Sequence, residues 1–215
     1  MARWTDEEEA RRLREMSTWE KPYWETGKLA AGTDEVGRGP LAGPVVAACV
    51  ILPCECLLRG VDDSKKLSAA RREKLYPIIL EHAVTYGIGW VWPMQIDSMN
   101  IRQATRLAFK LAFNAMEKKP DILFVDAEEN LDIPVPQMAI IHGDALCYSI
   151  AAASVLAKVE RDRYMMEQDA LYPGYGFGKH KGYGTAQHIA ALRELGPCPL
   201  HRRSFIRHFV EETHG

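Results

Sequence analysis

The sequence predicts an α/β protein with a mixed sheet flanked by helices, and three observations support this. Two apolar segments, 29–36 and 45–52, are joined by a loop rich in glycine and proline, as expected for neighbouring strands. A third run, 84–92, combines the β-branched and aromatic residues that favour strands. From there on, helical and strand-like patterns alternate, which is typical of a mixed α/β sheet.

The other elements follow from local patterns. Ser68 is suited to cap a helix that begins at Ala69, because a serine oxygen can accept a hydrogen bond from the first turn. Apolar residues then recur at helical spacing from about residue 99. The remaining predictions are an amphipathic helix over 3–25 that is broken at Pro22, a helix over 99–118, short strands over 122–125 and 138–141, and a long helix over 145–168.

Bulk composition is that of a soluble, single-domain protein. The 215 residues are 47% hydrophobic and 26% charged, which suits one domain with a real core. The charged N-terminus lacks the apolar stretch of a signal peptide, and the longest uncharged run is interrupted by Arg38 and prolines. Five cysteines, an odd number, suggest free thiols, and Cys54 and Cys56 lack a second pair to complete a zinc site. We therefore expect a cytoplasmic protein without a membrane segment.

The C-terminal third is basic although the net charge of the chain is −2. Residues 173–208 contain six lysines and arginines but a single acid, Glu194. A local basic surface of this kind is compatible with nucleic-acid binding, which the overall charge does not exclude. The candidates for contacts with a phosphate backbone are Lys179, Lys181 and Arg202, with His180, His188 and His201 as further candidates for approaching phosphates.

The segment 32–44 is the most informative part of the chain. Two adjacent carboxylates, Asp34 and Glu35, precede a loop of glycines and prolines that contains Arg38. Glycine lets backbone N–H groups approach a sugar-phosphate chain, and arginine can bind a phosphate through two parallel hydrogen bonds. The carboxylates would repel that phosphate unless a divalent cation lay between them. The segment therefore predicts a metal-dependent phosphodiester site.

Four acids lie where strands end or a helix begins: Asp34, Glu35, Asp126 and Asp144. Functional groups gather at such positions in open sheets, and carboxylate oxygens favour magnesium or manganese. Taken singly, Asp144 is equally well placed to cap its helix, Asp126 to lie in a turn, and Asp34 and Glu35 to be solvated. The acids in polar loops, expected at the surface, are Asp62, Asp63, Glu128, Glu129 and Asp132.

Five blocks in fixed order extend beyond the segment 32–44: 63–67, 123–126, 142–144, 149–159 and 180–185. Together they resemble the ribonuclease HII family over roughly residues 30–205. The resemblance implies a ribonuclease H-like core at 29–170, after an N-terminal helical arm at 1–28 and before a small C-terminal helical extension at 171–215 that helps to bind substrate. It also implies that Asp34, Glu35, Asp126 and Asp144 hold two Mg²⁺ or Mn²⁺ ions, with Asp34 bridging both.

The activity implied by the resemblance is endonucleolytic. The enzyme would hydrolyse the RNA strand of RNA–DNA hybrids and cut 5′ of single ribonucleotides embedded in duplex DNA, leaving 3′-hydroxyl and 5′-phosphate ends. Reading a 2′-hydroxyl needs groups that donate and accept hydrogen bonds. The implied substrate-binding residues are Gly37, Arg38, Gly39, Lys65, Lys66 and Tyr183.

Other interpretations remain open for these residues and for the whole chain. Tyr183 can be a packed turn residue, and Lys65 with Lys66 can form a charged turn before a helix. The alternative functions are another two-metal nuclease or recombinase of the same fold, a non-catalytic hybrid-binding protein, and a small-molecule phosphatase. We expect a monomer, since no pattern indicates an additional interface.

Overall fold

The computed structural model describes residues 4–54, 57–128 and 130–210. Their strands form one sheet in the order β3-β2-β1-β4-β5, with β1 antiparallel to β2 and parallel to β4. The mixed sheet expected from the sequence is confirmed. The strands are β1 (Ala30–Val36), β2 (Val45–Ile51), β3 (Thr85–Val91), β4 (Ile122–Asp126) and β5 (Gln137–Ile140).

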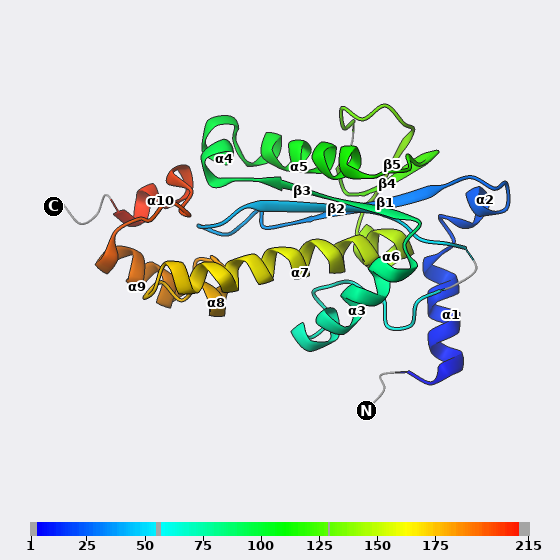
Figure 1. The fold of residues 1–215 in the computed structure, drawn as a ribbon, viewed down its shortest axis with the longest axis horizontal. Coiled ribbons are helices and arrows are strands. Elements are labelled where there is room, and N and C mark those ends of the chain that lie inside the picture. The colour runs from blue at the N-terminus through cyan, green and yellow to red at the C-terminus, as the bar shows by residue number, and fades with distance from the viewer. Residues whose placement is uncertain (1–3, 55–56, 129, 211–215) are drawn as a thin grey trace.

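Helices cover both faces of the sheet (Figure 1). On one face lie α4 (Pro93–Met99) and α5 (Ile101–Ala115), and on the other α3 (Ala69–His82) and the long α7 (Tyr148–Leu171). Each face has its own buried apolar cluster, because alternate residues of a strand point to opposite sides. Strands β2 and β4 are buried on both faces, which explains their nearly continuous apolar sequences.

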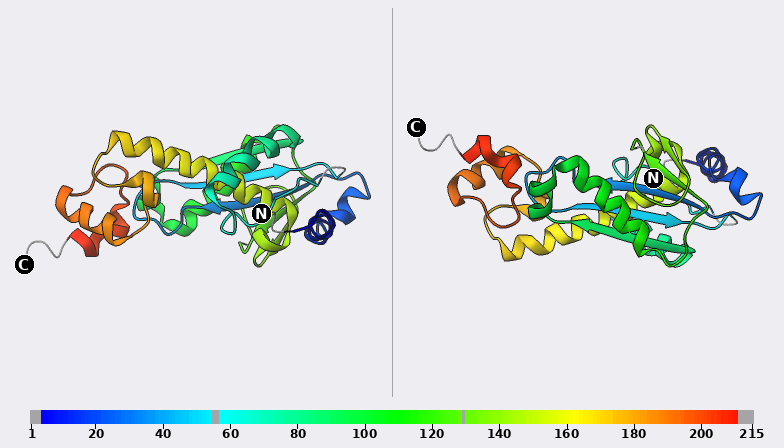
Figure 2. Two further views of the ribbon diagram at one scale, coloured as in Figure 1. Left: turned by 90° about the horizontal axis from the view of Figure 1, so that it is seen from below. Right: turned by 90° about the horizontal axis from the view of Figure 1, so that it is seen from above.

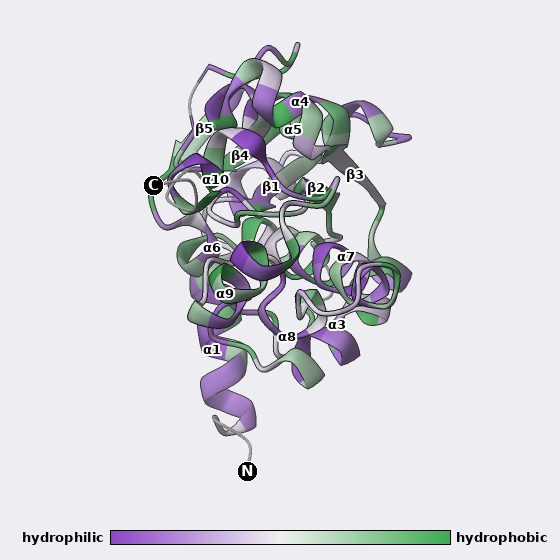
Figure 3. Ribbon diagram, turned by 90° about the vertical axis from the view of Figure 1, so that its left-hand side faces the viewer, coloured by the Kyte–Doolittle hydropathy of each residue, from purple (hydrophilic) through white to green (hydrophobic). Residues whose placement is uncertain are grey.

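The first two and the last three helices lie towards opposite ends of the long axis (Figures 1 and 2). At one end are α1 (Asp6–Met16) and α2 (Lys21–Trp24), and at the other α8 (Phe177–His180), α9 (Ala186–Leu195) and α10 (Arg203–Val210). Helix α1 is predominantly hydrophilic in Figure 3. Pro22 was expected to break a helix but lies in the first turn of α2, where its missing N–H group is no loss. Residue 3 of the expected arm lies outside the described residues.

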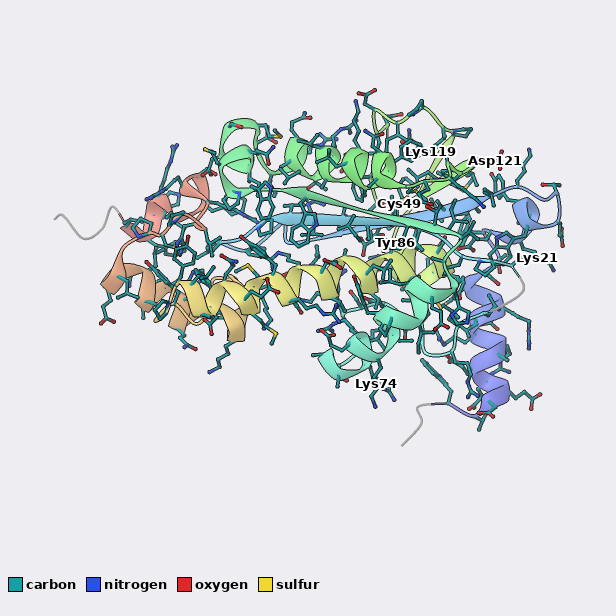
Figure 4. The ribbon with its side chains drawn as sticks, viewed as in Figure 1. Lys21, Cys49, Lys74, Tyr86, Lys119 and Asp121 are labelled. Atoms are coloured by element: carbon teal, nitrogen blue, oxygen red, sulfur yellow. The ribbon has the colours of Figure 1, made fainter. Side chains whose placement is uncertain are left out.

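Two side chains labelled in Figure 4 fix the start of β4 beside the start of β1. Lys119 Nζ donates to three carbonyl oxygens at the end of α5, and Asp121 accepts the Leu29 N–H at 2.8 Å. The parallel register then pairs Thr33 with Val125. Asp34 and Asp126, the next residues along each strand, are thereby brought to the same level of the sheet.

The helix expected over 145–168 is two helices. α6 (Gly143–Leu146) ends at Cys147, whose backbone is extended, and α7 begins directly afterwards. The buried carboxylate of Glu20, just before α2, occupies the break: one of its oxygens accepts hydrogen bonds from the N–H and hydroxyl groups of Ser149. The helix expected over 99–118 is α5, capped by Asn100, which accepts two N–H groups of its first turn. No helix among the described residues is long and apolar enough to cross a bilayer.

Candidate functional site

Three carboxylates predicted from the sequence meet near the end of β1, at the end of β4 and at the start of α6. Asp34, Asp126 and Asp144 each offer one oxygen, and these oxygens lie within 4.8 Å of one another. Asp34 and Asp144 are buried, and Asp126 is half-buried. Glu35 is not a member of this group, although it is adjacent to Asp34 in β1. The sequence therefore located the cluster, and the structure separates Glu35 slightly from its centre.

The backbone of α6 places Asp144 beside Asp126. The N–H of Gly143 donates to Asp126 Oδ1 at 2.7 Å, which holds the first turn of α6 against the end of β4. A Cβ at Gly143 would lie 2.6 Å from a methyl group of Ile150 and 3.3 Å from Asp126 Oδ1. Glycine therefore leaves room for this approach without a shift of the Ile150 side chain. Asp144 is the second residue of α6 and His142 occupies the N-cap position, so the interpretation of Asp144 as a helix cap is wrong.

Burial and like charge make this cluster unfavourable for ionised carboxylates. Burial, with Glu35 and Asp126 adding to it, raises the pKa of Asp34 well above its usual value. Burial and the charge of Asp144 raise the pKa of Asp126 in the same direction. The pKa of Glu35 is raised by burial, an effect that Arg38, 3.5 Å away, opposes. A cation among these oxygens would relieve the repulsion, and hard oxygen donors of this kind fit Mg²⁺ or Mn²⁺.

Lys65 reaches into the cluster. Its Nζ lies 2.7 Å from Asp144 Oδ2, although the rest of the side chain is largely exposed. Burial lowers the pKa of Lys65, but the hydrogen bond and charge of Asp144 outweigh it and raise that pKa above its usual value. Lys65 is thus the cation at this edge of the cluster, within reach of a phosphate that approached the carboxylates.

The turn that carries Lys65 is built by two acids expected at the surface. Asp62 and Asp63 are instead buried, and that expectation is wrong. Asp63 accepts the Lys65 N–H, Asp62 accepts the Asp63 N–H, and Lys66 Nζ lies within 4 Å of both carboxylates. The expectation failed because short polar segments give no sign of whether their acids accept backbone hydrogen bonds.

Tyr183 lies on an exposed turn next to the glycine loop. Its side chain is 41% exposed, and its ring centroid lies 5.9 Å from the guanidinium carbon of Arg161 in α7. The preceding residue is fixed to the loop 37–44, because Gly182 O accepts the N–H groups of Leu41 and Ala42. The turn and the loop therefore form one unit, with the Tyr183 ring available on its surface.

Several basic residues expected to contact phosphates lie elsewhere. Arg202 is completely buried, so the prediction that it contacts a nucleic-acid backbone directly is wrong. His180, His188 and His201 are also buried, packed beneath the turn of Tyr183. Lys179 is exposed, and Lys181 is half-buried with its ammonium group bonded to the Gly178 carbonyl. The polar character of these side chains predicted surface positions. The buried side chains of Arg202, His180 and His188 instead donate hydrogen bonds to backbone carbonyl groups.

The hydrogen bonds of His188 and His201 require both rings to be neutral. His188 Nδ1 donates to the carbonyl of Tyr183, so its Nε2 must accept the proton of His201 Nε2, 3.0 Å away. His201 Nδ1 in turn accepts the N–H of Cys198. A second proton on either ring would place two donors against each other. Burial, together with His188, lowers the pKa of His201 to about 4, and burial also lowers that of His188.

Acid should therefore destabilise the protein through these histidines. In the unfolded protein His201 binds a proton near pH 6.5, whereas in the folded protein it does so only at about pH 4. The contribution of neutral His201 to stability is therefore complete above pH 6.5 and is lost as the pH falls towards 4. The expected loss is on the order of 3 kcal/mol in the free energy of unfolding. Urea unfolding between pH 7 and 4 measures it. His201→Asn should flatten the profile relative to His82→Gln, a matched change of an exposed histidine on α3; equal profiles in both variants would contradict this assignment.

Two structurally important residues were not singled out from the sequence. Glu20 binds the first turn of α7, and Arg161 lies under the glycine loop. Arg161 follows Ala153 and Ala157 and precedes Met165 at four-residue spacing, so it lies on the buried face of α7. A charged residue on that face was a usable signal. Nothing in the sequence pairs Glu20 with Ser149.

The family model and similar curated relatives agree on one family. The family model described as ribonuclease HII matches residues 31–208. The chain is 52% identical to a ribonuclease HII of Acetivibrio thermocellus over 205 residues, covering 95% of this chain and 80% of the relative. It is 50% identical to a ribonuclease HII of Caldanaerobacter subterraneus subsp. tengcongensis, covering 95% and 86%.

Solved structures agree at the level of the fold. The ribonuclease H2 of Pyrococcus horikoshii superposes with a TM-score of 0.74 at 27% identity, covering 86% of this chain and 98% of that one. The RNase HII of Archaeoglobus fulgidus, solved in complex with PCNA, gives 0.68 at 28% identity, with 81% and 93% covered. Bst-RNase HIII with Mn²⁺ gives 0.65 at 19% identity, with 87% and 65% covered, and shows a similar fold alone.

Proposed function

Since the chain belongs to the ribonuclease HII family and is a ribonuclease H enzyme, we propose that it hydrolyses the RNA strand of RNA–DNA hybrids and cuts 5′ of single ribonucleotides embedded in duplex DNA. The observation that carries the proposal is the cluster of Asp34, Asp126 and Asp144, which adjoins a glycine loop at the end of the same strand as Asp34. Family membership removes the non-catalytic alternative and disfavours a recombinase or a small-molecule phosphatase.

The proposed chemistry assigns the acidic cluster to metal binding and the surrounding residues to the substrate. Asp34, Asp126 and Asp144, with Glu35 beside them, would hold two Mg²⁺ or Mn²⁺ ions. Bound divalent cations supply activation of the attacking water and stabilisation of the charge on the departing 3′ oxygen. Cleavage of that P–O3′ bond leaves a 3′-hydroxyl and a 5′-phosphate. Because Lys65 is held at the rim of the cluster by Asp144, it is positioned to bind the phosphate adjacent to the cut.

The glycine loop and Tyr183 are the proposed readers of the ribose. Gly37, Arg38 and Gly39 offer backbone groups to the 2′-hydroxyl, and the exposed ring of Tyr183 offers a stacking surface for a sugar. Lys66 is a weaker candidate for a phosphate contact, because its ammonium group already faces Asp62 and Asp63.

The remaining parts of the proposal concern organisation and setting. We assign residues 1–28 to an arm, 29–170 to the catalytic core and 171–215 to an extension that supports substrate binding. The substrates are RNA–DNA hybrid and duplex DNA with embedded ribonucleotides, and the protein acts as a monomer in the cytoplasm. Light scattering of the purified chain tests the oligomeric state directly.

The decisive experiment is cleavage of a labelled DNA duplex that contains one ribonucleotide. The expected result is a single cut 5′ of the ribonucleotide with Mg²⁺ or Mn²⁺, none with chelator, and none in an all-DNA duplex. Cleavage restricted to long RNA–DNA hybrids would contradict the junction-reading role. Cleavage of the all-DNA duplex would favour a DNA nuclease of the same fold.

Tyr183→Ala should impair cleavage at a single embedded ribonucleotide more than cleavage of an RNA–DNA hybrid. Loss of one aromatic stacking contact weakens binding by about 1–3 kcal/mol, or about fivefold to 150-fold. The measurement is kcat/KM on both substrates. Tyr86→Phe is the matched control, because Tyr86 is equally exposed on β3 and lies outside the proposed site. An equal loss on both substrates would remove Tyr183 from ribonucleotide recognition.

A further inference from the structure

Two arginines are buried behind the glycine loop without any carboxylate partner among the described residues. Arg161 in α7 and Arg202 just before α10 are each fully buried. The two acids with the closest electrostatic influence are engaged elsewhere. Asp162 pairs with Lys158 and Arg72, and Asp97 accepts backbone N–H groups at the start of α10. Buried charges normally need an opposite charge, so this pair requires another explanation.

Arg161 joins the glycine loop to the turn of Tyr183. Its Nε donates to Pro44 O at 2.9 Å, and its terminal nitrogens donate to Ala42 O at 3.1 Å and Lys181 O at 2.9 Å. All three acceptors are backbone carbonyls. The planar fork of one guanidinium group therefore fixes the distance between residues 42–44 and the turn that presents Tyr183.

Arg202 holds the other side of the same loop. Its three nitrogens donate to the carbonyl oxygens of Gly43 at 2.9 Å, Arg38 at 3.0 Å and Gly37 at 2.5 Å. A Cβ at Gly37 would lie 2.4 Å from Arg161 Nε, so the loop and the two guanidinium groups are closely packed. Lysine cannot reproduce three donors in one plane at these positions.

The two side chains orient the loop in one direction. Carbonyl groups of Gly37 and Arg38 point inward to Arg202, whereas the N–H groups of Gly37, Arg38 and Gly39 have no hydrogen-bond partner among the described residues. Consecutive free N–H groups favour an acceptor such as a phosphate or hydroxyl oxygen. Two positive charges behind the loop add to that preference.

We propose that Arg161 and Arg202 are positioning residues that set substrate selectivity, by holding the free N–H groups of the Gly37–Gly39 loop and the ring of Tyr183 in one fixed relation. This inference rests on the proposed function. It assigns neither arginine a contact with the substrate, and it explains why arginine occupies two buried positions that an apolar residue would otherwise fill. The charge remains inside the protein and acts through the loop.

The test compares Arg161→Lys and Arg202→Lys with Arg163→Lys, a matched change of an exposed arginine on α7. We measure kcat/KM for a duplex with one ribonucleotide and for an RNA–DNA hybrid on the same preparation. The ratio of the two values is independent of the fraction of folded enzyme. We expect it to fall at least about tenfold in the two buried-site variants, since small displacements of a positioning group have large kinetic effects, and to be unchanged in Arg163→Lys.

A second measurement distinguishes positioning from direct contact. The slope of log affinity against log salt is negative, and removal of a residue that binds a phosphate reduces its magnitude by about 0.9. Arg202→Gln should leave the slope unchanged, whereas Lys65→Gln should make it less steep. An altered slope in Arg202→Gln, an unchanged substrate ratio in both lysine variants, or lysine variants with no folded protein would each overturn the inference. If the wild-type protein cleaved neither substrate, the proposed function itself would fail.

Discussion

Asp34→Asn is expected to abolish cleavage and, at the same time, to stabilise the metal-free protein. Asparagine keeps the size of the side chain and can still accept the Glu35 N–H, which Asp34 Oδ1 accepts at 2.8 Å. It removes a charge that is buried among other carboxylates. We expect turnover to fall by about a thousandfold or more, the upper range for losing one electrostatic stabiliser of a transition state.

The stability change follows from the raised pKa of Asp34. A carboxyl whose pKa is higher in the folded than in the unfolded protein destabilises the folded state as the pH rises from the unfolded pKa through the folded pKa. Below both pKa values this destabilisation is absent. Asp34→Asn should therefore raise the melting temperature of the metal-free protein at neutral pH by several degrees, because about 1 kcal/mol shifts it by about 2–4 °C in a chain of this size. The difference between variant and wild type should shrink as the pH falls.

Manganese gives a readout that does not depend on catalysis. A ligand that binds only the folded state at about a hundred times its Kd stabilises that state by about 2.7 kcal/mol. Wild type should show this increase in a thermal unfolding curve, and Asp34→Asn should lose most of it. Asp132→Asn is the control, since Asp132 is exposed and pairs with Lys110 away from the cluster. Retained cleavage, or an unchanged manganese effect, would place the metal site elsewhere.

Sheet elements were predictable because runs of apolar, β-branched and aromatic residues give a strong local signal. The strands at 30–36, 45–51 and 85–91 lie within a residue of their expected limits. Helix ends were less predictable when distant residues decide them. The break at Cys147 depends on the carboxylate of Glu20, more than a hundred residues away in the sequence. Local spacing contains no information about such a contact.

The acidic cluster was predictable for a related reason, and the supporting residues were not. Asp34 lies near the end of β1, Asp126 ends β4 and Asp144 lies in the first turn of α6, and the parallel register of β1 and β4 brings the two strand positions together. The prediction for Arg202 was wrong because its charge alone suggested a surface position. Its burial depends on three carbonyl groups of the glycine loop, more than 150 residues earlier, which only the folded chain brings within 3.0 Å of the guanidinium nitrogens.

Gly32→Ala should unfold or severely destabilise the protein, although the substitution adds one methyl group. A Cβ at Gly32 would lie 2.2 Å from Ile150 N and from the carbonyl carbon of Ser149, both in the backbone of the first turn of α7. Backbone atoms of a packed helix cannot move aside as a flexible side chain can. The helix must instead separate from β1, which loosens the apolar cluster on that face of the sheet.

The same displacement should disturb the metal site. Gly32 and Asp34 point to the same face of β1, because side chains alternate along a strand. Asp144 lies in α6, the short helix that directly precedes the helix that would move. We expect a loss of about 3 kcal/mol in the free energy of unfolding, the upper range for overpacking, and a smaller manganese effect on the melting temperature.

Gly39→Ala is the matched control for stability. Nothing lies within 4 Å of a Cβ at Gly39, and its backbone is outside the left-handed region. Its free energy of unfolding should stay within about 0.5 kcal/mol of wild type, as for most surface substitutions. Urea unfolding of the two variants with and without manganese makes the comparison. Equal stability of Gly32→Ala and Gly39→Ala would mean that α7 does not pack on β1 as closely as described, and the position of Asp144 beside Asp34 would then lose its structural basis.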